Sequence, residues 1–158
     1  MDNTFKLLLF LHVAAVVVAL GPTFAFPFLD GIANRKGVAA TRFAHQFEQR
    51  LETIWIRPGA ILLFLFGLGM ILKDDDLRED MPVWLMIGAT WFVVAFLVAL
   101  FVQGRNLKNA LAALDGVPDD APLPDAYTAV SKRVQMVGGL LGLSVVCIAF
   151  LMVWKPGE

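Results

Sequence analysis

Four long apolar stretches constrain the fold of this chain more than any other feature of its sequence. They run over residues 5–28, 54–72, 83–102 and 134–154. A helix that crosses the hydrocarbon core of a bilayer needs about 20 apolar residues, at roughly 1.5 Å of rise each. The sequence therefore predicts an all-α membrane protein, a bundle of four transmembrane helices that forms a single integral membrane domain over residues 1–158.

The composition supports this interpretation. The chain is 58% hydrophobic with a mean hydropathy of +0.71, and 17% of its residues are charged, whereas soluble domains carry about 25%. The net charge of −1 provides no basic surface for nucleic acid. The single cysteine, Cys147, excludes an intrachain disulfide and a zinc–thiolate cluster. We expect the lipid bilayer to be the main partner of this chain.

Lysine and arginine predict how the spans are oriented, because cytoplasmic loops carry an excess of these residues. The first and third connections hold nine of them: Arg35, Lys36, Arg42, Arg50, Arg57, Arg105, Lys108, Lys132 and Arg133. The other side holds four: Lys6, Lys73, Arg78 and Lys155. We therefore expect both termini outside the cell (N-out, C-out), in a multi-pass protein of the bacterial plasma (inner) membrane.

The two cytoplasmic connections are predicted to be helical extensions of the spans. In RFAHQFEQRLETIWIRP, apolar residues recur at helical spacing, namely Phe43, Phe47, Leu51 and Ile54. The segment NLKNALAAL extends the third span in the same way. His45 lies on the polar side of the first extension, and we interpret it as a solvated interface residue. The sequence shows no metal-spaced acidic cluster, and no span carries an acidic residue.

His12 is an ionisable residue inside the first apolar stretch. Intramembrane ionisable residues are rare and often functional, and a neutral imidazole is a frequent ligand of haem iron and other metals. The alternative is a packing role, in which the ring is hydrogen-bonded to a neighbour such as Ser144 or Thr90. Both interpretations remain open at this point.

Two sulfur-bearing residues share the predicted outer leaflet with His12. At ~1.5 Å of rise per residue, His12 lies roughly 9 Å below the outer boundary, Met86 about 6 Å and Cys147 about 12 Å. One imidazole with soft sulfur ligands suits haem b or Cu(I). The candidate cofactor-binding residues are therefore His12, Met86 and Cys147, with His12 as the metal ligand. Taken singly, each sulfur residue also fits ordinary packing within a span.

The Gly21–Pro22 pair predicts a kink or a helix end within the first stretch. Proline cannot donate a helix hydrogen bond, and its ring clashes with the carbonyl group four residues earlier, which is that of Val18. We expect the hydroxyl of Thr23 to bond this freed carbonyl. In the fourth stretch, Gly138 and Gly142 form a small-xxx-small pattern that is typical of close helix contacts, either within the chain or in a homodimer.

Several of these segments resemble one known family. The opening LLLFLHVAAVVVALGPTFAFP, the segment IRPGAILLFLFGLGMIL and the ending FLMVWKPG resemble bacterial predicted integral membrane proteins that form a domain of unknown function, along essentially the whole chain. More distantly, the Leu–His pair in the first of four spans is similar to the copper-resistance protein D group and to HemJ-type membrane protoporphyrinogen oxidases. The latter group implies haem b, with His12 as the residue carried over.

Two functions remain open on this evidence. The first is a small membrane protein that binds haem b or a metal through His12. The second is a non-catalytic accessory or assembly subunit of a membrane complex, held by glycine faces and helical extensions. A transporter is less favoured, because the spans lack polar lining residues. No Ser/His/Asp set or phosphate-binding loop predicts an enzymatic activity.

Overall fold

The computed structural model describes residues 2–157, and within that range it contains helices and no strand. The first half comprises α1 (Asn3–Ala15), η1 (Val16–Leu20), η2 (Gly21–Ala25), α2 (Phe26–Lys36), α3 (Val38–Leu51), η3 (Glu52–Ile56) and α4 (Arg57–Lys73). The second half comprises α5 (Asp75–Glu79), α6 (Val83–Leu97), η4 (Val98–Gln103), α7 (Gly104–Ala112) and α8 (Asp125–Trp154). The η segments are short 3-10 or π-helical turns inside longer helices.

These elements join into four helices, within the described residues, that are long and apolar enough to cross a membrane: Asn3–Lys36, Val38–Lys73, Val83–Ala112 and Asp125–Trp154. Each predicted span lies inside one of them, which confirms the all-α, four-span bundle. Helices of 30 to 36 residues are roughly 45–54 Å long, whereas the hydrocarbon core is about 30 Å thick. The remaining length lies beyond the apolar stretches, at one end of the bundle.

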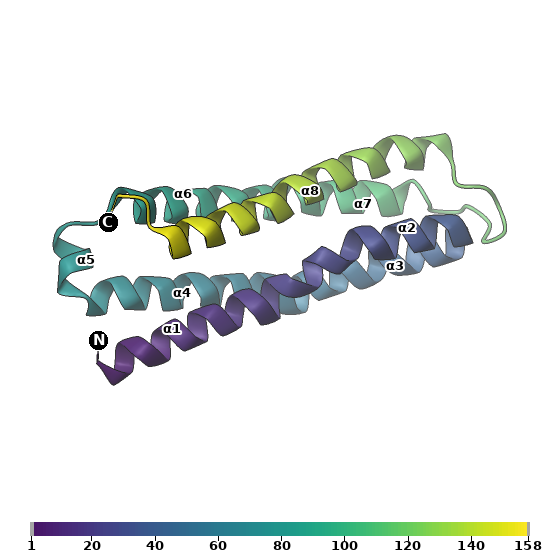
Figure 1. The fold of residues 1–158 in the computed structure, drawn as a ribbon. Coiled ribbons are helices and arrows are strands. Elements are labelled where there is room, and N and C mark those ends of the chain that lie inside the picture. Colours follow the sequence, from purple (N-terminus) through teal and green to yellow (C-terminus); the bar gives the residue numbers. More distant parts are fainter. Residues whose placement is uncertain (1, 158) are drawn as a thin grey trace.

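This end, which we call the polar end, holds the α2–α3 turn and the α7–α8 connection (Figure 1). Both chain termini and α5 lie at the opposite end. The helical extensions predicted from the sequence are α3 on one side and α7 on the other, and they continue the spans in line; α2, which was not predicted, continues the first span in the same way. The N-out, C-out orientation remains a prediction, in which the polar end is cytoplasmic.

The four helices form two hairpins. In the first hairpin α1 packs along α4 and α2 packs against α3, and in the second α6 and α7 both pack against α8. Contact between α3 and α7 joins the hairpins at the polar end. Nearer the termini, the rings of Phe64 in α4 and Phe92 in α6 stack with centroids 6.1 Å apart. The hairpins are thus joined mainly at the polar end.

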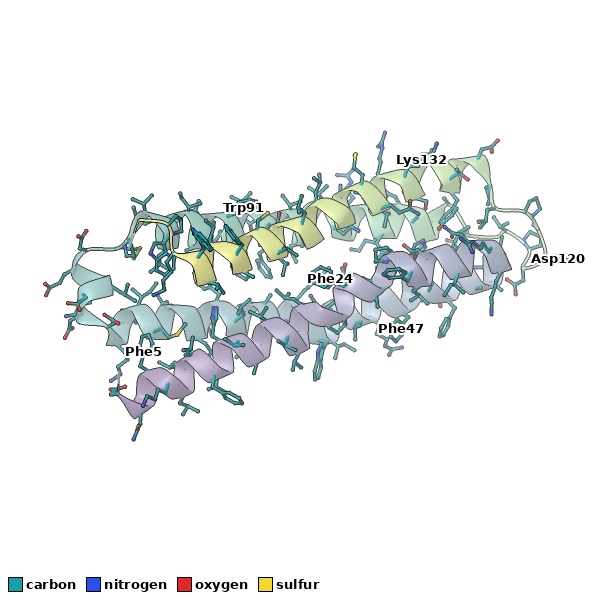
Figure 2. The ribbon with its side chains drawn as sticks, in the orientation of Figure 1. Phe5, Phe24, Phe47, Trp91, Asp120 and Lys132 are labelled. Atoms are coloured by element: carbon teal, nitrogen blue, oxygen red, sulfur yellow. The ribbon has the colours of Figure 1, made fainter. Side chains whose placement is uncertain are left out.

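Large apolar side chains of the spans point outward all around the bundle (Figure 2). Phe10, Leu140 and Val153 are 67%, 60% and 84% exposed, respectively. In water this arrangement would be unfavourable, but lipid tails are as apolar as these side chains, and burying them inside the protein gains little. The surface therefore matches a bundle that is surrounded by lipid.

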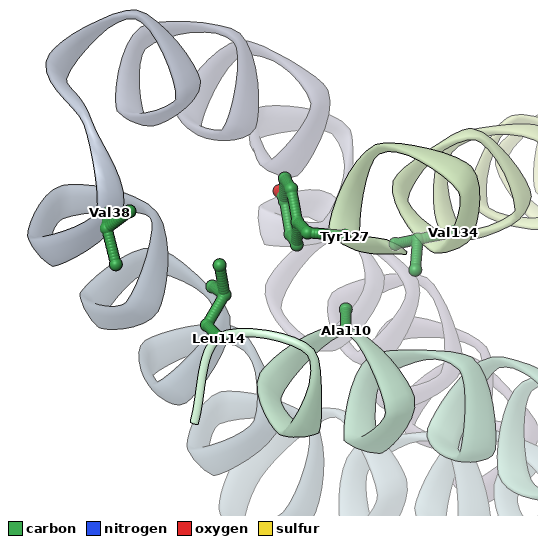
Figure 3. Close-up of a cluster of buried hydrophobic side chains, with 5 residues drawn as sticks. All are labelled: Val38, Ala110, Leu114, Tyr127 and Val134. Carbon is green, nitrogen blue, oxygen red and sulfur yellow. The ribbon is translucent and has the colours of Figure 1, made fainter. Parts of the chain in front are cut away.

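The buried apolar core lies at the polar end instead (Figure 3). Five side chains from both hairpins form it: Val38, Ala110, Leu114, Tyr127 and Val134. Tyr127 projects from the start of α8 toward the α2–α3 pair. Burial of apolar surface from water stabilises a fold by about 25 cal/mol per Å², so this cluster holds the hairpins together where lipid is absent.

Arg42 of α3 fastens the α7–α8 connection to the first hairpin. Its guanidinium donates hydrogen bonds to the carboxylate of Asp119 at 2.6 Å and to the carbonyl oxygens of Leu114 and Val117 at 3.0 and 2.8 Å. Charge-assisted hydrogen bonds are about twice as strong as neutral ones. The connection is therefore held against α3, directly beside the buried core.

The predicted break at Gly21–Pro22 is present as a 3-10 turn between η1 and α2. Thr23 does not bond the carbonyl that Pro22 frees, contrary to our expectation. Its hydroxyl donates instead to the Leu20 carbonyl at 2.6 Å. The Val18 carbonyl accepts a hydrogen bond from the indole Nε1 of Trp55 at 3.0 Å. A side chain of the neighbouring helix thus replaces the bond that proline removes.

The structure does not place a close helix contact at Gly138 and Gly142. A Cβ atom added at Gly138 would lie 3.5 Å from the amide nitrogen of Gln103. One added at Gly142 would lie 3.7 Å from the ring of Phe24. Both distances are ordinary van der Waals contacts, so these glycines do not bring two backbones together.

The closest approach involves Gly59 of α4. A Cβ atom added there would overlap the Cβ of Ala19 in η1. A similar overlap with the methyl group of Met152 occurs at Gly88, but that side chain is flexible. The contact that requires glycine therefore lies inside the first hairpin, at the π-helical turn of its first helix.

Candidate metal centre

His12 lies half-buried on α1 and faces α4. Its Nδ1 is 2.9 Å from the Leu63 carbonyl oxygen, and because a carbonyl can only accept, Nδ1 carries the proton. A Cβ atom added at Gly67 would lie 3.2 Å from the ring, so the glycine makes room for the imidazole. The hydrogen-bond partner is thus a backbone group of α4, and the neutral ring keeps an unprotonated Nε2.

The structure places the two sulfur-bearing candidates in the other hairpin. Met86 is 46% exposed on α6, and Cys147 is half-buried on α8. Since α1 packs along α4 while α6 packs against α8, His12 is separated from Met86 and Cys147 by the division between the hairpins. Ser144, considered as a partner of His12, accepts a hydrogen bond from Trp91 at 3.1 Å.

The second histidine, His45, lies on α3 at the polar end of the bundle. His45 is fully buried, with 0% of its surface exposed, so the interpretation as a solvated residue is wrong. It forms a buried cluster with Asp30 of α2 and Glu48 of α3, whose exposed fractions are 4% and 3%. One ligand atom from each of the three residues lies within 4.8 Å of the others. We call this group the acid–histidine cluster.

The turn at Gly37 brings the acid–histidine cluster together. Its φ of +105° lies in a region that glycine adopts without strain, and it lets α3 fold back along α2. Asp30 lies seven residues before this turn and His45 eight residues after it, so the two residues reach the same level. Glu48 follows His45 by three residues on the same helix face.

The proton positions around His45 follow from its neighbours. The Tyr127 hydroxyl donates to the amide oxygen of Asn34 at 2.8 Å, so its oxygen accepts from the ring Nε2 of His45 at 2.9 Å. Burial lowers the pKa of His45, which keeps the imidazole neutral. With the proton on Nε2, the other nitrogen, Nδ1, presents a lone pair to the two carboxyl groups.

Three acceptor atoms therefore converge without a donor between them. His45 Nδ1 is 3.1 Å from Glu48 Oε2 and 3.5 Å from Asp30 Oδ1. Asp30 Oδ1 and Glu48 Oε1 are buried and have no hydrogen-bond partner. Buried polar atoms without partners are rare in native proteins. Either protons or a cation must occupy the space between these groups.

The pKa values of the acidic groups in and beside the cluster are raised. The cluster lies outside the predicted spans 5–28 and 54–72. Burial, assisted by the negative charge of Glu48, raises the pKa of Asp30 to about 7. Burial likewise raises the pKa of Glu48 to about 8 and raises that of the Tyr127 phenol. Without a cation, the carboxyl groups hold protons near neutral pH.

The distances from His45 Nδ1 to the two carboxylate oxygens fit one small divalent ion. Two ligand atoms about 2.1 Å from a tetrahedral ion lie roughly 3.4 Å apart, and the distances of 3.1 and 3.5 Å from Nδ1 bracket this value. Imidazole nitrogen with carboxylate oxygen suits Zn²⁺ and similar first-row ions. A ligating histidine usually donates its other ring N–H to an orienting partner, which is the role that Tyr127 has here.

The sequence does contain a signal for this cluster, namely the helical spacing of polar residues in α3, but that spacing alone predicts a solvated polar face rather than a buried one. Thr41, His45 and Glu48 follow one another at helical spacing and are all buried, whereas Phe43 and Phe47 on the same helix are 66% and 47% exposed. Helix α3 is therefore amphipathic as predicted, but the part of its polar face that holds Thr41, His45 and Glu48 points inward. The acidic partner, Asp30, comes from another helix and has no sequence signal of its own.

The chain as a whole is similar to one family of known proteins. No curated protein and no solved structure gave a significant match. The family described as predicted integral membrane protein (DUF2269) matches residues 6–156. This match covers nearly the whole chain and agrees with the four membrane-crossing helices. The chain therefore belongs to this family of predicted integral membrane proteins.

Proposed function

We propose that this protein binds one divalent transition-metal ion at the acid–histidine cluster and uses it to fix the polar end of the bundle. The observation that carries the proposal is the convergence of three acceptor atoms around His45 Nδ1, with its tautomer fixed by Tyr127. A cation on this point would satisfy Asp30 Oδ1, a buried oxygen that lacks a partner. One imidazole with two carboxylates is a ligand set that Zn²⁺ and similar first-row ions accept.

The burial of the cluster favours a structural ion over a catalytic one. Catalytic zinc sites keep one position open to exchanging water or substrate, whereas structural sites are closed; the three residues here leave a fourth tetrahedral position, which an enclosed water molecule would fill. Asp30, His45 and Glu48 are each less than 5% exposed. The ligands come from α2 and α3, and Tyr127 reaches them from α8. An ion here would therefore stabilise the junction of the two hairpins, as befits an accessory or assembly subunit of the bacterial inner membrane.

Metal titration of the chelator-treated protein in detergent tests this proposal. We expect one equivalent of Zn²⁺ or Co²⁺ to bind and to raise the melting temperature, because ligands that bind only the folded state stabilise it. His45→Ala and Glu48→Gln should abolish this shift. His12→Asn, which alters the histidine outside the cluster, is the matched control and should keep it. If neither ion changes the melting temperature of the wild-type protein, the proposal is contradicted, whatever the variants show.

Haem b at His12 is the second candidate function. The hydrogen bond from Nδ1 to the Leu63 carbonyl leaves Nε2 available, and ligating histidines are commonly oriented in this way. Met86 and Cys147 remain the proposed second ligands, and a haem would have to lie between the hairpins to reach them. Protein from haem-sufficient cells should then show a Soret band that His12→Ala removes. Colourless protein would eliminate this candidate and leave the metal proposal intact.

A further inference from the structure

A polar groove of about 350 Å³ runs between α3 and α7 at the polar end. Arg42, Gln46 and Gln49 line it from α3. Lys108 of α7 and Asp115, in the turn after α7, line it from the other side. The groove lies on the outside of the bundle, separate from the acid–histidine cluster, and contains donors, acceptors and both signs of charge.

The charges of the groove are arranged in order along the bundle. Gln49 lies five residues before Ile54, where the second apolar stretch begins, and Lys108 lies six residues after Val102, where the third ends. These positions are about 7–9 Å beyond the apolar stretches, close to the depth of lipid headgroups. Asp115 lies a further seven residues on, and therefore farther from the membrane.

The two charges that remain available are Lys108 and Asp115. Arg42 is already paired with Asp119 at 2.6 Å and bonded to two backbone carbonyls. Among the residues that the structure describes, neither Lys108 nor Asp115 forms an ion pair. The groove thus offers one cation near the membrane, one anion farther out, and the amide N–H donors of Gln46 and Gln49 beside the cation.

We propose that this groove binds the headgroup of a zwitterionic phospholipid that carries a phosphodiester and a primary ammonium, as phosphatidylethanolamine does. The phosphate lies against Lys108 and the glutamine amides, and the ammonium lies against Asp115. The acyl chains then run toward the membrane over the exposed side chains of Phe101 and Val102. In such a lipid the ammonium is the terminal group of the headgroup, so it can extend farther from the membrane than the phosphate and match the order of charges along the groove.

An anionic headgroup fits the groove less well. Phosphatidylglycerol offers the same phosphate to Lys108, but its terminal glycerol is neutral and supplies no cation for Asp115. The groove should therefore prefer the zwitterionic lipid, and Asp115 should determine this preference while Lys108 serves both lipids.

Native mass spectrometry of the detergent-solubilised protein, with equal amounts of phosphatidylethanolamine and phosphatidylglycerol, tests this inference. Ion pairs in exposed positions are worth up to about 1 kcal/mol, which corresponds to roughly fivefold in affinity. We expect Lys108→Gln to lower retention of both lipids by about three- to fivefold. Asp115→Asn should lower retention of phosphatidylethanolamine by a similar factor and leave that of phosphatidylglycerol unchanged.

Two exposed residues outside the groove, Lys132 and Asp120 (Figure 2), supply the controls. Lys132→Gln and Asp120→Asn make the same chemical changes and should leave lipid retention as in the wild type. Equal loss in these controls, or unchanged retention in both groove variants, would overturn the proposal. Competition by soluble glycerophosphoethanolamine at a concentration equal to that of the lipid would overturn the lipid as the source and assign the groove to a free phosphodiester.

Discussion

The hydroxyl of Tyr127 lies 2.9 Å from Nε2 of His45, although the two residues are 82 positions apart in the chain. Tyr127 stands at the start of α8 in the second hairpin, and His45 lies on α3 in the first. Because the phenol donates to Asn34, it accepts the Nε2 proton and turns the free nitrogen toward Asp30 and Glu48. One hydrogen bond across the junction of the hairpins thus determines which ring nitrogen of His45 carries the proton.

Replacing Tyr127 with phenylalanine should test this link. The variant removes the acceptor of the buried Nε2–H, and an unsatisfied buried group costs about 1–3 kcal/mol. Loss of the orienting partner of a metal-ligating histidine typically lowers metal affinity by about 10- to 100-fold. Thermal unfolding and Zn²⁺ competition against a chromophoric chelator measure the two effects. Thr128→Val, at the exposed neighbouring position, is the control, and equal Zn²⁺ affinity in all three proteins would refute the orienting role.

The stability of the metal-free protein should fall as the pH rises from 7 to 9. The pKa values of Asp30 and Glu48 are raised to about 7 and about 8, well above those of the unfolded chain. The folded state therefore binds more protons in this window, and the stability that they supply is lost as pH rises through the folded pKa values. We expect a loss on the order of 1 kcal/mol.

Bound metal should reverse this trend. Metal ligands must be deprotonated, so the affinity for Zn²⁺ rises with pH. Chemical unfolding at several pH values, with and without saturating Zn²⁺, compares the two states. A metal-free protein whose stability stays constant between pH 7 and pH 9 would show that these carboxyl groups are already ionised in the fold, as in an ordinary salt bridge.

Gly59 should tolerate a side chain less well than the glycines of α8. Gly59→Ala places a methyl group onto the Cβ of Ala19, and such overpacking typically costs about 1–3 kcal/mol. Gly139→Ala meets no atom within 4 Å and should be neutral or slightly stabilising, because alanine favours helix more than glycine does. Melting temperatures in one detergent provide the comparison. Equal melting temperatures for both variants would mean that η1 and α4 do not pack closely at Gly59.

The orientation of the bundle can be tested with reporter fusions. The excess of lysine and arginine in the first and third connections predicts that a reporter fused after Gly116 lies in the cytoplasm and that one fused after Asp76 lies outside. Alkaline phosphatase and green fluorescent protein report the two sides. The opposite pattern would put the acid–histidine cluster outside the cell, where it would meet a different supply of metal.

The fold could be predicted from the sequence because lipid solvation acts on long stretches of residues. Four apolar runs of sufficient length define four helices, whatever their packing partners are. The helical extensions could also be predicted, from the spacing of Phe43 and Phe47. What the spacing could not show is which face of α3 turns inward, since this depends on whether the helix lies flat on a membrane or stands in line with a span.

The contacts of single polar groups were harder to predict, because their partners are set by tertiary packing. His12 bonds a backbone carbonyl at Leu63, and backbone groups have no sequence signature. Trp55 bonds the Val18 carbonyl, and no pattern in the sequence pairs these two residues. The acid–histidine cluster needs the turn at Gly37 to bring two helices together, so no local motif reveals it.

The central claim is that a metal ion binds between Asp30, His45 and Glu48. X-ray absorption at the zinc K-edge of the protein loaded 1:1 with zinc tests this claim most directly. We predict a first shell of oxygen and nitrogen at about 2.0–2.2 Å, including one imidazole, with no sulfur. His45→Ala should remove the imidazole contribution. A sulfur shell near 2.3 Å would assign the ion to Cys147 or a methionine, and failure to load one equivalent of zinc would show that protons alone hold the cluster together.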